Sequence, residues 1–302
     1  MSEDCNSQIL VFDVGGSHIA ASLFHPAGMT IGKLHSLPVR ETGNADEFFA
    51  AFESLAELML PASAPRSGVA VAIPNPFDYE HGISYMRHKY RQLYGNDLRK
   101  GLGEKLGCDS TRVHFLNDAA AFLIGELFHG AATGVSRAVG IALGTGVGSA
   151  FAVDGKIVVT GRGVPPGGEI WNLPYRDSTV ENLVSTRSVQ RRYEQLTGKC
   201  AEVRDIAALG INDPNVRQTF EAFGKELGKV LRHTCVEFAP QRIVLGGGVS
   251  RAAGLFLAAA EKELADLDIH LRVSDLLERA PLIGAGVSWK SNYLTREEIR
   301  TE

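Results

Sequence analysis

The chain has 302 residues, of which 44% are hydrophobic, and its 31 Lys and Arg against 35 Asp and Glu give a formal net charge of −4. This length and apolar content allow one large hydrophobic core or two medium ones. The near-balanced charge lacks the basic excess typical of nucleic-acid binding. The polar, acidic start "MSEDCNSQ" has no signal-peptide pattern, and no apolar run approaches the ~20 residues that span a bilayer. We therefore expect a cytoplasmic protein with no nucleic-acid or membrane partner.

The cysteines are widely spaced and form no CxxC pair: Cys5, Cys108, Cys200 and Cys235. This pattern argues against a disulfide framework and against a zinc ribbon, and it fits a reducing compartment. We expect all four to be structural or without a role.

The N-terminal part of the sequence alternates apolar runs with amphipathic ones. "SQILVFDVGG" (7–16) predicts a strand that ends in a glycine turn, and "SHIAASLFHP" (17–26) predicts the returning strand. "NADEFFAAFESLAELML" (44–60) has apolar residues at helical spacing. The next predicted elements are a buried strand in 67–76, a helix in 97–107, and a strand that leads into a helix in 111–130.

The C-terminal part follows a similar plan. "SRAVGIALGTGVGSAFAVDGKIVVTG" (136–161) repeats the opening order of strand, glycine-rich turn and strand. A Gly/Pro-rich loop (162–178) and mostly helical segments follow. Residues 240–267 then predict a strand, a triple-glycine turn and a helix, and 280–300 predict a terminal helix. Because strands alternate with helices along the chain, the fold class is α/β.

Three glycine-rich turns follow apolar strands. Glycine lets backbone N–H groups approach an anion without an intervening Cβ, and neighbouring hydroxyls add donors for phosphate oxygens. Each turn alone could be a structural hairpin, and neither GxGxxG nor GxxxxGK[ST] occurs in the chain. Together they predict a phosphate cradle, with Asp13 holding Mg²⁺ through water. The turn residues are Gly15, Gly16 and Ser17; Gly144, Thr145 and Gly146; and Gly246, Gly247 and Gly248.

Asp118 follows an apolar strand and Asn117, and it precedes the apolar run "AAAFLIGELF". Two interpretations are open. Asp is a good helix N-cap, worth about 1 kcal/mol. A carboxylate at the end of a strand can also accept the proton of an attacking hydroxyl.

The stretch "RHKYRQLYG" (87–95) gathers Arg87, His88, Lys89 and Arg91. A solvated basic face is one interpretation. The alternative is a lid that attracts the phosphates of ATP or an acceptor that already carries negative charge.

In this order, "DVGGSH", "PNP", "LNDAAAFLIGE", "LGTGVGS", "GGEI" and "LGGGVS" resemble the ROK sugar kinases, small members of the actin-like ATPase superfamily. The resemblance covers nearly the whole chain. It implies two ribonuclease-H-like α/β domains, a sugar deep in the cleft between them, and MgATP held by the glycine turns. We expect a small domain of residues 1–117 plus 283–302, and a large domain of residues 118–282. Dimers are usual in the family, so a homodimer is possible.

The resemblance also implies roles for single residues. Asp13, Gly15, Gly16 and Ser17 match the first phosphate loop. Gly144, Thr145 and Gly146 match the second, and Gly246, Gly247 and Gly248 match the adenosine-side turn. Asp118 resembles the catalytic base, and Asn117 beside it binds sugar hydroxyls. Glu169 in "GGEI" and Glu181 in "VENLVS" resemble the two sugar-binding glutamates.

Two features depart from the family pattern. Where the family has Gly-His after its first glutamate motif, this chain has Trp171 and Asn172. The CxCGxxGC zinc loop is also missing, so we expect no structural zinc. Asn172 is the candidate to donate a hydrogen bond to a sugar hydroxyl in place of the histidine.

The sequence thus predicts an ATP- and Mg²⁺-dependent kinase of a hexose, glucose first. N-acetylamino sugars, mannose and fructose remain alternative acceptors, and polyphosphate an alternative donor. A sensor that binds sugar without turnover is a further alternative. A sugar-responsive repressor is disfavoured, because the first phosphate loop begins at Asp13 and leaves no room for a helix-turn-helix domain ahead of it.

Overall fold

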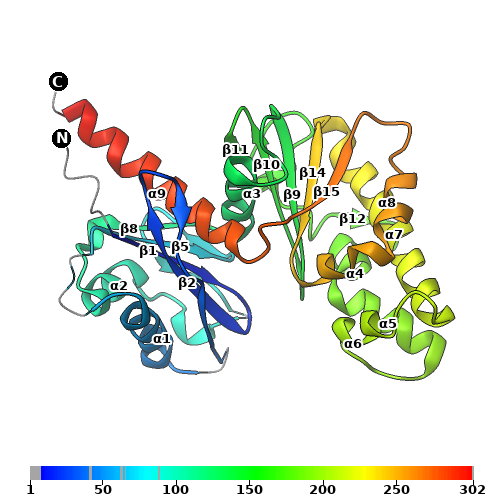
Figure 1. Cartoon of the computed structure of the whole chain (residues 1–302), viewed down its shortest axis with the longest axis horizontal. Coiled ribbons are helices and arrows are strands. Elements are labelled where there is room, and N and C mark those ends of the chain that lie inside the picture. Colours follow the sequence, from blue (N-terminus) through cyan, green and yellow to red (C-terminus); the bar gives the residue numbers. More distant parts are fainter. Residues whose placement is uncertain (1–7, 41–42, 62–63, 65, 88, 301–302) are drawn as a thin grey trace. The chain divides into compact units, whose positions relative to one another are not determined.

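The computed structural model describes residues 8–40, 43–61, 64, 66–87 and 89–300. The chain forms two compact units, Met1–Gly125 with Glu278–Glu302 and Glu126–Leu277 (Figure 1). These boundaries fall inside helix α3 (Asp118–His129) and just before helix α9 (Arg279–Arg300), whereas the sequence led us to expect them before α3 and within α9.

The N-terminal unit is built on a mixed sheet of order β3-β2-β1-β5-β8, with β4 also paired to β2. Strands β1 and β2 form an antiparallel hairpin, and β1, β5 and β8 run parallel. The strands are β1 Ile9–Val14, β2 His18–His25, β3 Thr30–Ile31, β4 His35–Pro38, β5 Gly68–Ile73 and β8 Val113–Asn117.

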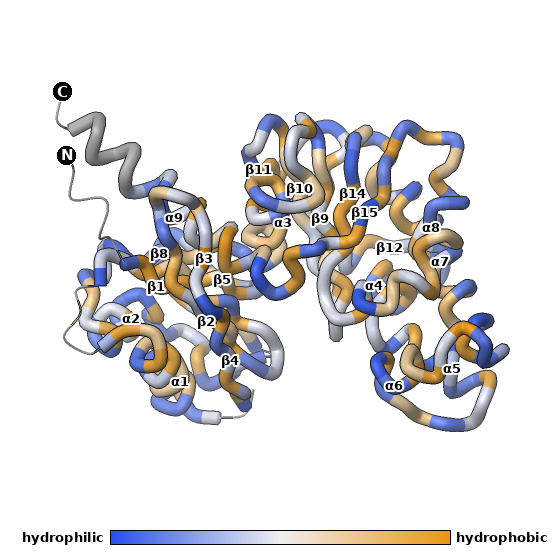
Figure 2. Tube along the Cα trace, viewed as in Figure 1, coloured by the Kyte–Doolittle hydropathy of each residue, from blue (hydrophilic) through white to orange (hydrophobic). Residues whose placement is uncertain are grey.

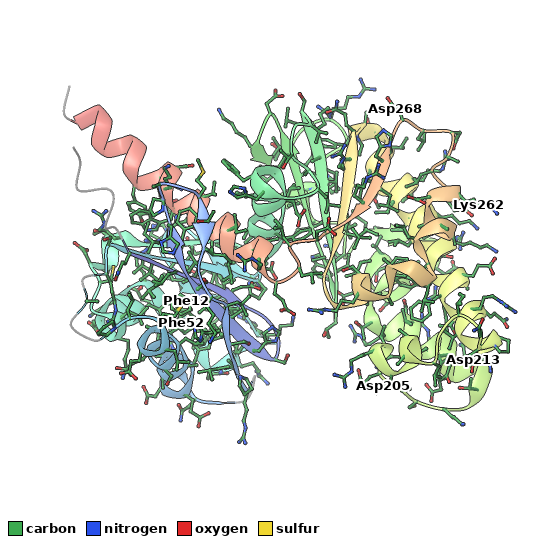
Figure 3. The ribbon with its side chains drawn as sticks, viewed as in Figure 1. Phe12, Phe52, Asp205, Asp213, Lys262 and Asp268 are labelled. Carbon is green, nitrogen blue, oxygen red and sulfur yellow. The ribbon has the colours of Figure 1, made fainter. Side chains whose placement is uncertain are left out.

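Helices cover both faces of this sheet, which explains why β1 is continuously apolar from Ile9 to Phe12 (Figure 2). Alternate residues of β1 pack with α1 (Ala45–Met59) and α2 (Leu98–Leu106). Phe12 and Phe52 meet there with ring centroids 4.7 Å apart (Figure 3). On the other face α9 packs against β1 and β5, and Trp289 of α9 is fully buried beside Gly68.

Helices α3 and α9 cross at small residues within the N-terminal unit. A Cβ on Gly284 would lie 1.8 Å from the carbonyl oxygen of Ala121. Overpacking of this kind costs about 1–3 kcal/mol, occasionally more. We expect Gly284→Ala to lower the free energy of unfolding by at least that amount, measured by urea denaturation. Gly254→Ala, where a Cβ meets nothing within 4 Å, is the matched control and should leave stability almost unchanged.

A short hairpin of β6 (Phe77–Asp78) and β7 (Ile83–Ser84) follows β5, and a 3₁₀ turn, η2 (Arg91–Leu93), precedes α2. The side chain of Asp78 accepts hydrogen bonds from the backbone N–H groups of Glu80 and His81, which fixes the turn between the two strands. This segment, residues 74–97, is called the strap below.

The second unit repeats the plan of the first: a hairpin, β9–β10, whose first strand also pairs in parallel with a later strand, β14. The sheet order is β11-β10-β9-β14-β15, and α7 packs its apolar side chains against β9 and β14. The elements are β9 Arg137–Leu143, β10 Val147–Val153, β11 Lys156–Val158, β12 Pro174–Tyr175, β13 Ser178–Thr179, α4 Val180–Val184, α5 Thr186–Thr197, α6 Val203–Ala208, α7 Pro214–Cys235, β14 Arg242–Gly246, α8 Leu257–Lys262 and β15 His270–Val273.

The predicted α/β class is confirmed, and the two glycine hairpins lie between strands as expected. One expectation was wrong in detail. The chain after the triple glycine forms a 3₁₀ segment, Gly248–Leu255, and the α-helix begins only at Leu257. In the part of the chain that the structure describes, no helix is long and apolar enough to cross a bilayer.

Candidate active site

Asp118 and Asn117 stand where β8 passes into α3, at the carboxyl edge of the parallel strands. Asn117 Oδ1 accepts a hydrogen bond of 3.1 Å from the backbone N–H of Ala120, so Asn117 caps the helix. Asp118 is the first helical residue, and its Oδ1 accepts from Ala119 N at 2.8 Å. The interpretation of Asp118 as the N-cap is therefore wrong, and its carboxylate sits in the favourable field of a helix N-terminus.

Asp13 lies near the end of β1, on the same edge of the sheet as Asp118. The strand β5 separates them, with Asp13 in register with Ala72 and Ile73 in register with Asn117. Burial raises the pKa of the Asp13 carboxyl to about 7, and the charges of Asp118 and then Glu278 add to the shift. The structure therefore brings Asp13 and Asp118 into one electrostatic site, together with Glu278, which sequence reasoning missed.

The first glycine turn joins β1 to β2 beside Asp13. Gly15 N donates to His18 O at 3.0 Å, and Gly16 and Ser17 are exposed at the tip. The hydroxyl of Tyr90, 75 residues further along the chain, donates to Gly15 O at 2.6 Å and so helps to fix the turn. Neither glycine has a positive φ. At Gly15 a Cβ would lie 3.2 Å from His18 O, so glycine leaves needed space there.

The second turn carries a contact that the sequence did not predict. Glu181 Oε2 accepts a 3.2 Å hydrogen bond from Val147 N, and its Oε1 pairs with Arg187 at 3.2 Å. A Cβ on Gly146 would lie 2.5 Å from Glu181 Oε2. Glu181, expected to bind sugar, therefore lies directly on the turn of Gly144, Thr145 and Gly146.

The third turn ends β14, the strand beside β9, so it lies next to the second turn. Gly247 has a φ of 81°, and a Cβ there would lie 2.4 Å from Leu143 O, the carbonyl that ends β9. Ser250 donates from its hydroxyl to Gly247 O at 2.7 Å. Within the second unit, the structure therefore brings the turn at Gly246–Gly248 and the turn at Gly144–Gly146 together.

Glu169 lies on a loop that Ser149 of β10 holds from both sides. Ser149 Oγ donates to Gly168 O at 2.7 Å and accepts from Ile170 N at 3.0 Å. Trp171 Nε1 donates to Glu169 Oε2 at 2.9 Å. Asn172 is exposed beside it. Ser149 was not singled out, although its place after "GTGVG" was visible in the sequence.

Tyr79 is a further residue that sequence reasoning missed. Its hydroxyl donates to Asn75 Oδ1 at 2.8 Å and receives a 3.3 Å hydrogen bond from Asn117 Nδ2. Because Asn117 uses its oxygen to cap α3, this contact fixes both ends of the amide next to Asp118.

The donor set at Asp13 suits a magnesium ion carried by a nucleotide. Among the described residues, no group of three or more His, Cys, Asp or Glu side chains is arranged to hold a metal by itself. Mg²⁺ in phosphate-transfer sites takes one or two carboxylates and fills its remaining positions with water and phosphate. A divalent cation would also relieve the repulsion between Asp13 and Asp118 that raises the pKa of Asp13.

Comparison with known proteins identifies the family of the chain. The model of the ROK family matches residues 9–291. A glucokinase from Thermotoga maritima is 24% identical, with 92% of this chain and 96% of the relative aligned. An N-acetyl-D-glucosamine kinase from Escherichia coli O127:H6 is 25% identical over 83% of this chain and 87% of the relative.

The fold also matches solved structures. A ROK family glucokinase from Streptomyces griseus, solved with glucose and AMPPNP, superposes with a TM-score of 0.76 at 20% identity, covering 93% of this chain and 99% of that one. The family match extends over most of the chain, from the first strand into the terminal helix. The chain belongs to the ROK family, and its fold is that of the family's sugar kinases.

Proposed function

We propose that this protein transfers the γ-phosphoryl group of ATP to a hydroxyl of a hexose, with the 6-hydroxyl of glucose as the first candidate acceptor. The observation that carries the proposal is the pairing of Asp118, at a helix N-terminus, with Asp13, whose pKa is raised to about 7 at the same sheet edge. A base next to a carboxylate that needs a cation is what phosphoryl transfer to an alcohol requires.

In this reaction Asp118 accepts the proton of the sugar hydroxyl as the oxygen attacks the γ-phosphorus, and ADP leaves. Asn117 and Glu169 bind sugar hydroxyls, with Asn172 as a further donor. The N–H groups of the turns at Gly15–Ser17 and Gly144–Gly146 stabilise the phosphate charge, and Gly246–Gly248 contact the adenosine side. Asp13 would hold Mg²⁺ through water, and the ion would neutralise charge on the phosphates when bound.

Glu181 contacts both the phosphate turn and the proposed sugar loop. Its carboxylate accepts a hydrogen bond from Val147 N of the second turn, and its backbone N–H donates to Trp171 O, in the loop of Glu169, at 3.0 Å. We propose that Glu181 fixes the phosphate turn relative to the sugar loop, in addition to contacting sugar.

The relatives favour different acceptors. One is named for glucose and one for N-acetyl-D-glucosamine, at nearly equal identity. The exposed Trp171, hydrogen-bonded to Glu169, stands where the family has Gly of the Gly-His pair, so acceptor choice in this chain rests on different side chains. N-acetylamino sugars, mannose and fructose are therefore the alternative acceptors, and a sensor without turnover is the alternative function.

A coupled ADP assay over a panel of hexoses and N-acetylamino sugars, with ATP or polyphosphate as donor, tests the proposal. We expect ADP release with at least one hexose and none without acceptor. Heat of binding on mixing with sugar, together with no ADP from any sugar, would establish the sensor instead.

Gly146→Ala should uncouple the second turn from Glu181. The new Cβ would displace a carboxylate now 2.5 Å away, while the backbone of Gly146 is one that alanine accepts. Because misplacement by ~1 Å can cost about a hundredfold in rate, we expect kcat/KM to fall by about tenfold to a hundredfold with little change in melting temperature. Gly254→Ala is the matched control; an equal loss in that variant would contradict the assignment.

A further inference from the structure

The strap carries a basic and aromatic surface that the proposed reaction does not use. Two tyrosines fasten the strap to the site in the N-terminal unit. Tyr79 contacts Asn117, beside the proposed base, at 3.3 Å. Tyr90 is fully buried, packs on Phe48 and donates to Gly15 O in the first phosphate turn at 2.6 Å. The strap therefore runs from the acceptor end of this half of the site to its phosphate end.

Three cations flank the Tyr90 anchor: Arg87, Lys89 and Arg91. In the described part of the chain none of them has a carboxylate within ion-pairing distance, although the protein as a whole is acidic. Residue 88, the histidine of the same run, lies outside the described residues. Because residues 81–96 contain no Asp or Glu, these three cations give that stretch of the strap a local excess of positive charge.

An exposed pair of aromatic rings lies on the same strap. Tyr85 and Tyr94 are 44% and 45% exposed and pack edge to face with centroids 6.1 Å apart. The guanidinium of Arg87 lies 4.8 Å from the centroid of Tyr94 and donates to its hydroxyl at 2.8 Å. The strap thus holds apolar ring faces and a fixed cation side by side.

We propose that the phosphoryl acceptor is an anionic hexose derivative, which has a free hydroxyl for Asp118 and a carboxylate or phosphate elsewhere on the molecule. The acceptor ring packs on Tyr85 or Tyr94, and its charged group binds Arg87, with Lys89 and Arg91 adding attraction. This inference rests on the proposed function and narrows its substrate class. In the proposed reaction the donor's phosphates are bound by the N–H groups of the glycine turns, and the strap cations have no role.

The chemistry of the step is unchanged. The acceptor oxygen forms a bond to the γ-phosphorus, the bond from that phosphorus to ADP breaks, and the hydroxyl proton passes to Asp118. A guanidinium that binds a carboxylate or phosphate makes two parallel hydrogen bonds, which fixes the acceptor's orientation as well as its charge.

The test compares acceptors that share a free primary hydroxyl. Glucose and N-acetylglucosamine are the neutral arm, glucose 1-phosphate the phosphate arm, and N-acetylmuramic acid, a pyranose with a carboxylate and a free 6-hydroxyl, the carboxylate arm. We expect kcat/KM for one anionic arm to exceed that of the neutral sugars by about tenfold or more, the size of one charge-assisted hydrogen bond. The arm that wins identifies the charged group.

Arg87→Gln combined with Arg91→Gln should remove that preference by raising KM for the anionic acceptor about tenfold, with kcat and the KM of neutral sugars nearly unchanged. Lys100→Gln combined with Arg204→Gln, exposed cations outside the strap, is the control with the same charge change. If neutral hexoses are used at least as well as both anionic acceptors, or the strap variant behaves like the control, the inference is overturned while the proposed function stands. If no acceptor of either class leads to ADP release, the proposed function itself is overturned.

Discussion

Replacing Asp118 with asparagine is expected to lower kcat for sugar phosphorylation by about three orders of magnitude, within the range that general-base catalysis contributes. The side chain keeps its shape and its acceptor oxygen for Ala119 N, now 2.8 Å away, so the helix start should survive. Sugar affinity should change by only a few-fold, because an amide still hydrogen-bonds hydroxyls. Steady-state ADP release and calorimetric titration with sugar measure the two effects separately.

Asp97→Asn is the matched control for this substitution. Asp97 caps α2 through a hydrogen bond from Lys100 N, and asparagine caps helices equally well. This variant loses the same charge in the same unit, so it should retain the wild-type kcat. If Asp118→Asn keeps more than about a tenth of the wild-type kcat, Asp118 is not the base, since loss of a base costs at least about a hundredfold.

The local plan of the fold could be predicted from the sequence. The run "ILVF" (9–12) is apolar at successive positions because helices cover both faces of β1, and Asn44 caps α1 at the polar residue where the amphipathic pattern begins. The two hairpins with glycine turns followed from the same local signal. The 3₁₀ segment after Gly247 was missed because the pattern of "VSRAAGL" does not distinguish a 3₁₀ segment from an α-helix.

The site was harder to predict, because its contacts join distant parts of the chain. Tyr90 reaches Gly15 across 75 residues, and Glu181 reaches Val147 across 34. No local pattern encodes such pairs. The sequence marked Asp118 as a candidate by its place between a strand and a helix, but only the contact between Asn117 and Ala120 showed which residue caps the helix. Glu278 carries no motif, and its effect on Asp13 comes from the return of the chain at α9.

The activity of the wild-type protein should rise with pH through about 7 when MgATP is limiting. Burial, with the charges of Asp118 and Glu278, raises the pKa of Asp13 to about 7 in the protein without ligand. Only the ionised carboxylate attracts the metal, so kcat/KM for MgATP should increase as Asp13 loses its proton. At saturating MgATP the bound cation already favours the ionised form, so the profile of kcat should be flatter over the same range. Asp13→Asn should lose at least about a hundredfold in kcat/KM, as expected for removal of a group that supports transition-state charge.

The same substitution should stabilise the fold without ligand. An aspartate whose pKa is 3.8 when unfolded and about 7 when folded binds more protons in the native state between these values. The free energy of unfolding therefore falls as pH rises from about 4 to 7, by up to about 1.4 kcal/mol per unit of difference in pKa. Asparagine removes this dependence. Asp13→Asn should melt at a higher temperature than wild type at pH 8, and the gain should vanish towards pH 4.

A gain in stability joined to a loss of activity separates function from structure at this position. A residue kept for packing would lose stability when changed, whereas a carboxylate kept for a cation costs stability until the cation arrives. Mg²⁺ with ATP should accordingly raise the melting temperature of the wild type more than that of Asp13→Asn at pH 8. Equal stabilisation of both proteins by the nucleotide would mean that the metal is held elsewhere. The destabilising burial of the Asp13 charge would then have no part in metal binding.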